Sequence, residues 1–282
     1  MKETRAEYLP INKLHPFEGH PFKVTDNEEM DQLTWSILTQ GLLTPLVVRP
    51  LPNDEYEVIS GHRRLHACKK AGIQTVPALI TEMDRDAAAI ALVDSNLHRE
   101  KILPSEKAFA YKLKMEALSR QGYRTDLTSR QVVGKLETAD MIADNESGRQ
   151  VQRYIRLTNL IPGILQMVDE GKIALTPAVE LSYLTDTEQA DLLETMESED
   201  CTPSLSQAQQ LKQLSQAGQL DMDKIFNLLR EPKANQQEKI IFRVEELRKF
   251  FPQNYSALRI QETILRMLRD YQRRQMYDRG GR

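Results

Sequence analysis

The feature that most constrains this chain is a Gly-His-Arg-Arg turn at residues 61–64, placed where a β-rich run gives way to a helical one. The first N–H groups of a helix have no partner inside the helix and lie at the positive end of its dipole, so this end attracts anions. Gly61 lets the backbone approach a phosphate closely, and Arg63 and Arg64 supply planar donors that match phosphate oxygens. The turn therefore predicts a phosphate site at a strand-to-helix junction of an α/β domain.

A second motif, Ser95-Asn96-Leu97-His98-Arg99, follows on a predicted helix. Asn96 and Arg99 stand at i and i+3, so they lie on one helix face. Taken alone, a Gly-X-Arg-Arg turn is more often an exposed turn with solvated charges. The two motifs together predict a triphosphate pocket.

The hydrophobic pattern predicts an α+β protein in four segments. Residues 1–103 alternate short β-rich runs with helical ones and form an N-terminal α/β domain. Residues 104–200 are helical throughout and form a central all-α domain, while the polar, Gln- and Ser-rich residues 201–237 are expected to be a linker. Residues 238–282 form a small C-terminal domain that begins with a strand at 239–244. In the first domain we expect strands at 8–10, 46–49, 56–60 and 76–80 and helices at 26–39, 64–71 and 87–93.

The central domain contains a candidate DNA-binding element. A helix at 138–143, a short polar turn and a helix from Gly148 to about Asn159 form a predicted helix-turn-helix. A basic amphipathic helix is usually a solvated face, but its place after a short turn and a preceding helix favours DNA, since Arg reads guanine and Gln reads adenine in the major groove. The candidate DNA-binding residues are Ser147, Arg149, Gln150, Gln152, Arg153 and Arg156.

Charge is distributed unevenly along the chain. The total is −3, yet residues 185–232 carry −7 and residues 233–282 carry +6. A basic terminal segment suggests contact with phosphates without sequence preference. The predicted last helix, 255–275, has a narrow apolar seam that suits a partner helix, although packing against its own chain is the alternative. Because so small a unit buries little surface alone, we expect a homodimer. The seam residues are Ile260, Ile264, Met267 and Tyr271.

Other classes of protein fit the composition poorly. Cys68 and Cys201 form neither a disulfide framework nor a metal-ligand cluster. No apolar run approaches the ~18 residues that a membrane span needs, and the first residues lack a signal-peptide core. We therefore expect a cytoplasmic protein with no membrane partner.

The order of these motifs resembles the N-terminal domain of ParB/RepB-type chromosome and plasmid partition proteins. The resemblance runs from about Tyr8 to the helix that begins at Pro104 and continues more loosely through the next domain. Gly-His-Arg-Arg is a divergent form of the family motif, as on plasmids or mobile elements. The resemblance is carried by Tyr8-Leu9-Pro10-Ile11, His15-Pro16-Phe17, Gln40-Gly41-Leu42, Pro45-Leu46-Val47-Val48-Arg49, the Gly61 turn and Val76-Pro77-Ala78-Leu79-Ile80.

This resemblance implies a sulfiredoxin-like N-terminal fold that binds CTP with Mg²⁺. The family's triphosphate motif is matched by Gly61, Arg63 and Arg64. The family's second motif is matched by Asn96 and Arg99, which implies Asn96 as a magnesium ligand. A polar contact to the nucleotide is expected from Thr44. The family further implies a dimeric, CTP-gated clamp that binds a centromere-like site in double-stranded DNA. It also implies a ParA-type partition ATPase as partner and association with the nucleoid.

The sequence departs from the family pattern at sensitive positions. His62 stands where the family has a glutamate linked to hydrolysis, and Ser95 replaces the glutamate on the metal side. Asp94 is a candidate replacement carboxylate, although one residue rotates it about 100° around the helix. Lys23 stands where the family has an arginine that contacts phosphate. Lysine keeps the positive charge but cannot donate two parallel hydrogen bonds as arginine does. We expect nucleotide binding to survive better than CTP hydrolysis, for which His62 is the one catalytic candidate, the alternative being a surface histidine on a turn.

Two other functions compete with the partition clamp. One is a DNA-binding transcriptional regulator that kept the ParB fold without a working nucleotide switch, which the departures at His62 and Ser95 motivate. The other is a phosphotransferase or sulfiredoxin-like enzyme. A sulfiredoxin needs a cysteine beside the arginine turn, and here His62 occupies that place while Cys68 lies further along the helix.

Overall fold

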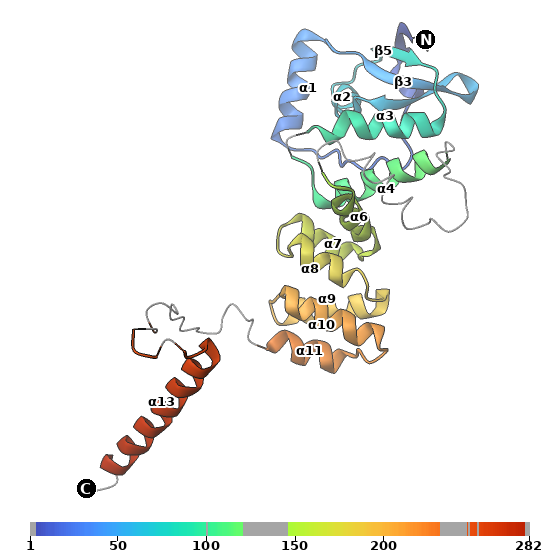
Figure 1. The fold of residues 1–282 in the computed structure, drawn as a ribbon. Helices are drawn as coiled ribbons and strands as arrows, with labels where there is room; N and C mark the ends of the chain where they lie inside the picture. Colours follow the sequence, from blue (N-terminus) through green and yellow to red (C-terminus); the bar gives the residue numbers. More distant parts are fainter. Residues whose placement is uncertain are drawn as a thin grey trace. The chain divides into compact units, whose positions relative to one another are not determined.

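The computed structural model describes residues 4–99, 101–120, 146–231, 247, 249–252 and 254–279. The chain forms two compact units, Met1–Glu231 and Pro232–Arg282. The first unit combines a mixed β-sheet with an array of helices (Figure 1), which confirms the α+β class.

The sheet has five strands in the order β1-β5-β3-β4-β2. β1 and β4 are antiparallel to their neighbours β5 and β3, whereas the β3–β5 and β2–β4 pairs are parallel. β3 and β4 form a hairpin whose turn places Asn53 and Asp54 at φ 62° and 58°, a left-handed region that Asn and Asp tolerate. The strands are β1 (Thr4–Pro10), β2 (Leu14–Pro16), β3 (Leu46–Leu51), β4 (Glu55–Ser60) and β5 (Thr75–Thr81).

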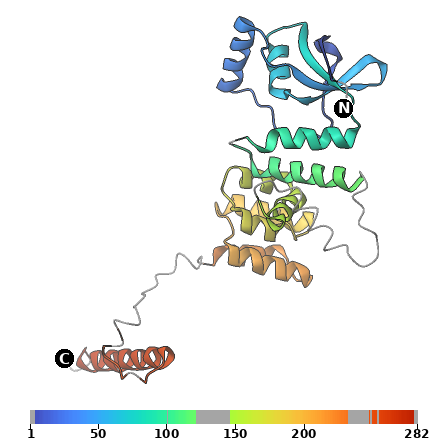
Figure 2. The ribbon, with the colours of Figure 1, turned by 45° about the horizontal axis from the view of Figure 1, so that its top comes forward.

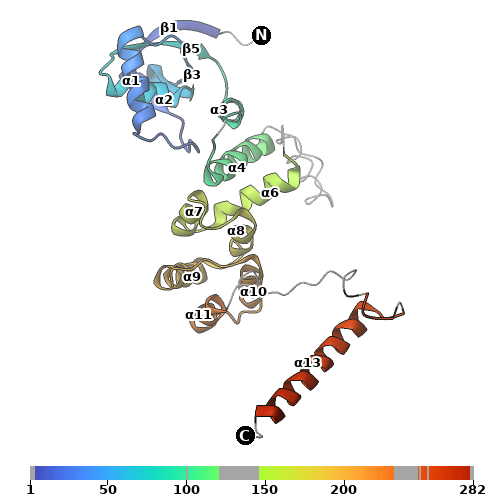
Figure 3. The same ribbon diagram turned by 90° about the vertical axis from the view of Figure 1, so that its left-hand side faces the viewer.

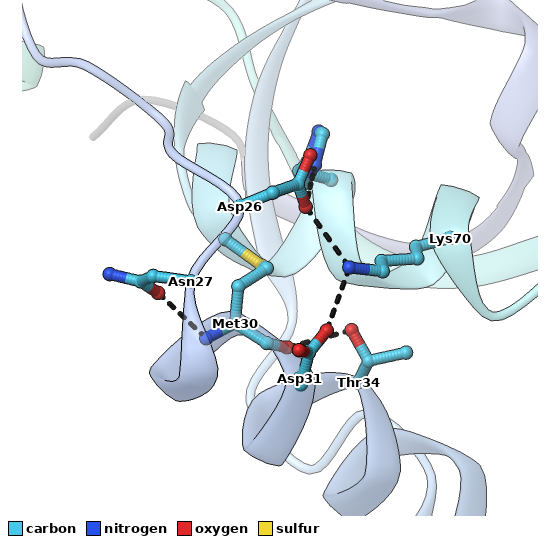
Figure 4. A network of polar contacts seen from close by, with 7 residues as sticks. Asp26, Asn27, Met30, Asp31, Thr34 and Lys70 are labelled. Carbon is cyan, nitrogen blue, oxygen red and sulfur yellow. Dashed lines mark hydrogen bonds and ion pairs between the residues drawn. The ribbon is translucent and has the colours of Figure 1, made fainter.

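Three helices accompany the sheet: α1 (Glu28–Gln40), α2 (His62–Lys70) and α3 (Arg85–Leu97). The side chain of Asn27 caps α1 by accepting a hydrogen bond from the N–H of Met30 at 3.0 Å. α1 packs on α2, and Lys70 of α2 lies between two aspartates, 3.2 Å from Asp26 and 2.7 Å from Asp31 (Figure 4). These ion pairs are exposed and contribute little, so burial of Met30 dominates the packing.

The remaining helices of the first unit follow one another as an array (Figure 3). α3 packs along α4, which joins the sheet domain to this array (Figure 2). One apolar core extends through the array and includes Leu157, Leu181, Leu192 and Leu211, all fully buried. The helices are α4 (Pro104–Arg120), α6 (Gly148–Arg156), α7 (Pro162–Asp169), α8 (Leu175–Leu181), α9 (Asp186–Ser198), α10 (Leu205–Gln216) and α11 (Met222–Arg230), and the short 3₁₀ helices are η1 (Ile11–Lys13), η2 (Pro52–Asp54) and η3 (Leu157–Asn159).

The linker predicted for 201–237 is wrong over 205–230, because α10 and α11 occupy this range. Ser204 and Gln207 form a capping box at the start of α10, and Ala208 and Leu211 are fully buried in the core of the array. The Gln- and Ser-rich composition belongs largely to the outer faces of α10. The three-residue spacing of Leu205, Ala208 and Leu211 was the signal for a helix.

One strand of the structure was not predicted, and two predicted elements fall on residues that the structure does not describe. Strand β2 was not predicted, because three residues are too few to show an alternating pattern. The first helix of the predicted helix-turn-helix, 138–143, and the predicted strand 239–244 lie outside the described residues.

The second unit contains the helix α13 (Ala257–Arg279). Ile260 is buried, whereas Met267 and Tyr271 of the predicted seam are exposed, together with Leu265 and Leu268. No helix in the described ranges is both long and apolar enough to cross a membrane.

The core of the helical array generates a stability prediction. Leu192→Ala removes a fully buried side chain from α9 and should lower the free energy of unfolding by about 2–5 kcal/mol, because both buried area and packing are lost. Urea denaturation measures this change. Glu194→Ala on the exposed face of the same helix is the control and should change the free energy by less than about 0.5 kcal/mol. Equal effects of both variants would contradict the assigned core.

Candidate functional site

Gly61 lies between β4 and α2, with a left-handed backbone that favours glycine. Its φ is 105°, and a Cβ atom there would lie 2.6 Å from Cδ2 of Leu46 and 3.0 Å from Nη2 of Arg64. No side chain caps the N-terminus of α2. The first N–H groups of the helix are therefore left for another acceptor, as an anion site requires.

Arg64 holds the loop that precedes β3. Its Nη1 donates to the carbonyl oxygens of Thr44, at 2.5 Å, and Pro45, at 2.8 Å. This arginine is half-buried, and burial lowers the pKa of its guanidinium. Arg64 thus connects the Gly61 turn to the loop that presents Thr44, whose side chain is exposed.

Arg63 points toward α1 instead. Its Nη2 lies 3.1 Å from Oε2 of Glu29, with both side chains well exposed to solvent. An ion pair of this kind is screened by water and contributes about 0–1 kcal/mol, so a phosphate can replace Glu29 at low cost.

Asn96 lies in the last turn of α3, whereas Arg99 follows the end of that helix, so the predicted shared helix face is wrong for Arg99. The Nδ2 of Asn96 donates to the carbonyl of Leu92 at 2.7 Å and to Oγ of Ser95 at 3.2 Å, which leaves Oδ1 as the open acceptor of this buried amide. The Arg99 guanidinium lies over the Phe22 ring, 5.4 Å from its centroid.

Electrostatics connect Arg99 to the turn. Its pKa is lowered by desolvation, raised by Glu106 and lowered by Arg63. Although the residue as a whole is exposed, the Phe22 ring removes water from one face of the guanidinium, which accounts for the desolvation. Ring contacts give the geometric link, because the His62 ring stacks on His20, the His20 ring faces Phe22, and the Arg99 guanidinium lies over Phe22.

His62 is not a surface histidine, so that alternative is wrong. The residue is only 6% exposed, and its ring stacks on that of His20 with centroids 3.7 Å apart. Its Nε2 accepts a hydrogen bond from the backbone N–H of Phe17 at 3.3 Å. Burial, followed by His20 and Arg99, lowers the pKa of His62 to about 3. The ring is therefore neutral at pH 7.

The carboxylates that the family motif would place near a metal are not available here. Asp94 forms an ion pair with Lys114 of α4 at 2.6 Å, and Ser95 donates to its own helix. Within the ranges that the structure describes, no cluster of three or more His, Cys, Asp or Glu side chains suits a metal ion. Asn96 Oδ1 is the group here that fits an oxygen-preferring cation such as Mg²⁺, which keeps most of its waters.

Lys23 links the sheet domain to the helical array, a connection that the sequence did not reveal. Its Nζ lies 3.1 Å from Oδ2 of Asp169 at the end of α7, and its backbone N–H donates to Glu106 at 2.7 Å. Asp169 also accepts from the N–H and the hydroxyl of Ser105, at 2.9 and 2.6 Å. Since the Asp169 side chain is 8% exposed, these bonds satisfy a nearly buried carboxylate.

The predicted recognition helix is α6. Some of its polar side chains are exposed, whereas others are hydrogen-bonded within the protein. Ser147 is the N-cap of α6 and accepts from the N–H of Gln150. Arg149 is exposed and forms no hydrogen bond or ion pair with the described part of the chain. Arg153 donates to Gln150 at 3.1 Å and to Thr176 of α8 at 2.6 Å.

Arg156, the last residue of α6, is held against neighbouring helices by its side chain. It donates to the hydroxyl and the carbonyl of Ser182, both at 3.2 Å, and its guanidinium lies 3.8 Å from the centroid of the Tyr183 ring. Lys212 of α10 contacts the same ring at 3.8 Å. These contacts fix α6 on its neighbours.

Comparison with known proteins places these features in a family. The ParB N-terminal domain model matches residues 1–97. The probable chromosome-partitioning protein ParB of Vibrio cholerae is 32% identical over 216 residues, which are 74% of this chain and 72% of that protein. The chain belongs to the ParB family.

Other ParB-family relatives match over shorter regions. The probable ParB of Pseudomonas putida is 32% identical over 190 residues, so the match spans 67% of this chain but only 60% of that protein. A nucleoid occlusion protein of Listeria monocytogenes is 36% identical over 138 residues, or 48% of this chain and 46% of that protein.

Solved ParB structures are also similar. A C-terminally truncated Caulobacter crescentus ParB complexed to the centromeric parS site has 23% identity and a TM-score of 0.42, covering 80% of this chain and all of that chain. The same protein complexed with CTP-gamma-S has 26% identity and a TM-score of 0.32, covering 68% and 99%. Because these scores are low, membership of the ParB family rests on the sequence matches.

The close approach at Gly61 generates a prediction with an internal control. Gly61→Ala should destabilise the protein by about 1–3 kcal/mol more than Gly72→Ala, as measured by urea denaturation. Both glycines have positive φ, but a Cβ at Gly72 meets nothing within 4 Å, so the difference reports the contacts with Leu46 and Arg64 together with the larger φ of 105° at Gly61. Equal destabilisation would show that the turn has room for a side chain.

Proposed function

We propose that this ParB-family protein is a partition protein that binds CTP through its N-terminal domain and DNA through α6. The observation that carries the nucleotide proposal is the uncapped N-terminus of α2 at Gly61, which has Arg63 in its first turn and is linked to Arg99 through the contacting rings of His62, His20 and Phe22. A site with unpaired helix N–H groups and excess positive charge suits a polyphosphate. A solved ParB from Caulobacter crescentus is complexed with CTP-gamma-S, and cytosine is the base that we propose for this site.

Each residue of the site has a distinct role in this proposal. The α2 N–H groups, Arg63 and Arg99 hold phosphate oxygens, and Asn96 Oδ1 is the protein ligand of Mg²⁺. Arg64 acts mainly by fixing the loop that presents Thr44. Bound Mg²⁺ supplies charge neutralisation between phosphate oxygens.

For DNA, α6 is the element that enters the major groove. Arg149 lies near the start of the helix and is exposed, as a side chain that reads a base edge must be. Gln150 and Gln152 are the other candidate base contacts. Arg153 and Arg156 act by orienting α6 on α8, because their guanidinium groups are already engaged there.

The proposed cycle is that of a dimeric DNA clamp. The second unit, with its exposed apolar residues on α13 and its basic charge, joins two copies, and CTP together with a centromere-like site brings the N-terminal domains together. A ParA-type ATPase is the proposed partner, and the nucleoid is the proposed location. We propose that hydrolysis of CTP is slow, since His62 is neutral and its Nε2 is already bonded to Phe17.

A second candidate function is a ParB-fold DNA-binding regulator without a nucleotide switch. The ion pair between Asp94 and Lys114 favours it, because it removes the nearest substitute for the missing metal-side glutamate. Genome-wide mapping of bound DNA identifies the cognate site and reveals spreading or its absence. Cross-linking of radiolabelled CTP with and without that DNA then separates the two functions, because the regulator binds CTP in neither condition.

The nucleotide site predicts the effect of removing Arg99. Arg99→Ala should weaken CTP binding by about 10- to 100-fold, because a charge-assisted contact to phosphate contributes about 1.5–3 kcal/mol. Calorimetric titration measures the affinity. Arg120→Ala, which removes the same charge from the end of α4, where Arg120 pairs with Asp86 of α3, should leave the affinity unchanged. Unchanged binding by Arg99→Ala would place the pocket elsewhere.

The DNA proposal predicts a loss of specificity when Arg149 is removed. Arg149→Ala should weaken binding to the cognate site by about 1–3 kcal/mol while affecting nonspecific DNA much less. Fluorescence anisotropy with cognate and scrambled duplexes measures both affinities. Arg230→Ala, an exposed arginine of α11 paired with Glu199, is the charge-matched control. An equal loss on both duplexes would assign Arg149 to a phosphate rather than to a base.

A further inference from the structure

Two histidines from distant segments stack behind the Gly61 turn. His62 is the first residue of α2, and His20 lies between β2 and α1, yet their ring centroids are 3.7 Å apart with an angle of 34° between the planes. The edge of the His20 ring also faces Phe22, at 5.7 Å, and the Phe22 ring carries the guanidinium of Arg99. The histidine pair is therefore next to the positive charge that the proposed nucleotide site uses.

The hydrogen bonds of the pair are incomplete. His62 accepts from Phe17 through Nε2, so neutral His62 holds its proton on Nδ1. His20 bonds the backbone of Phe22, while its Nε2 is buried and has no hydrogen-bond partner in the described structure. An unpaired buried polar atom is costly, so a group that bonds this nitrogen would recover that cost. A proton and an anionic acceptor would satisfy this nitrogen together.

Burial first, and nearby positive charge second, keep the pair neutral in the free protein. Burial lowers the pKa of His20 to about 4, and the charge of Arg99 acts in the same direction. Further cations of the sheet domain are Arg63 of α2, which pairs with Glu29, and Arg85, which lies over the Phe17 ring. The nearby carboxylates are engaged elsewhere: Glu106 of α4 accepts from Lys23 and Leu103, and Glu57 of β4 accepts from Glu18 and pairs with Arg49.

We propose that His20 is a phosphate ligand of this site and that it binds a phosphate oxygen through Nε2–H as an imidazolium, with the proton taken from solvent when the nucleotide enters. This inference rests on the proposed nucleotide site. One proton moves from water or buffer to Nε2, and no covalent bond of the nucleotide changes. The negative triphosphate opposes the effect of Arg99 and favours the charged ring.

Proton uptake fixes the sign of the pH dependence. The complex holds more protons than the free protein and free nucleotide, so affinity rises as pH falls. The limit is a tenfold change in affinity per pH unit for one full proton. If both histidines stayed neutral in the complex, their protonation would make no contribution to the pH dependence of the CTP affinity.

Calorimetry of CTP-gamma-S binding at pH 7.5 in HEPES and in Tris tests the proposal, because the two buffers differ in ionisation enthalpy. We expect the full-length protein to take up a fraction of a proton per site. His20→Gln keeps a polar side chain but should take up fewer protons on binding. It should also bind CTP-gamma-S on the order of tenfold more weakly, because one charge-assisted hydrogen bond is lost. His15→Gln, the same substitution at a half-exposed histidine that pairs with Glu55, should match the wild type.

The outcomes separate this inference from the proposed function. Binding of CTP-gamma-S with no buffer dependence, or with uptake unchanged in His20→Gln, overturns the role of His20 and leaves the nucleotide site standing. No binding at all overturns both. Nitrogen NMR of the wild-type histidines tests the proposal without relying on the folding of the variant. His20 should be neutral at pH 6 in the free protein and should convert to the imidazolium form when CTP-gamma-S is added at that pH. A ring that stays neutral when the nucleotide is bound also overturns the proposal.

Discussion

The contact between Gly61 and Leu46 determines how the N-terminal domain is organised. The helix α2 begins so close to β3 that a methyl group does not fit between them, and the chain must adopt a left-handed backbone at this point. The position of α2 then fixes where its N–H groups lie, how Arg64 reaches the loop before β3, and how His62 is turned into the interior. A shift of this one junction would alter all three together.

The cations near this turn are held with very different strengths in the free protein. Arg63 shares a solvent-exposed pair with Glu29, while Lys23 contacts a nearly buried carboxylate, Asp169, that also holds the start of α4. Exposed pairs exchange partners at little cost, whereas breaking a buried pair leaves an uncompensated charge. The arrangement therefore keeps Arg63 available to a ligand and commits Lys23 to the junction between the sheet domain and the helical array.

Sequence patterns predicted the parts of this protein that depend on neighbours in the chain. The strand-to-helix turn at Gly61, the helix with Asn96 and the helix α6 all follow from local periodicity and spacing. The burial of His62 depends on His20, and the pairing of Asp94 depends on Lys114, so neither follows from residues nearby in sequence. Composition misled the prediction for α10, because a helix needs only one apolar stripe to pack and its other faces can be rich in glutamine.

The brace from Arg64 to the loop before β3 has a consequence for how this site can diversify. Arg64 bonds the main-chain oxygens of residues 44 and 45, which every amino acid possesses, rather than their side chains. The identity of residue 44 can therefore change through mutation while the loop keeps its path. The path of the loop before β3 depends on main-chain bonds, whereas its chemistry depends on the side chain at position 44. Substitutions at this position can therefore change what the loop contacts while the Gly61 turn and Arg64 keep their places.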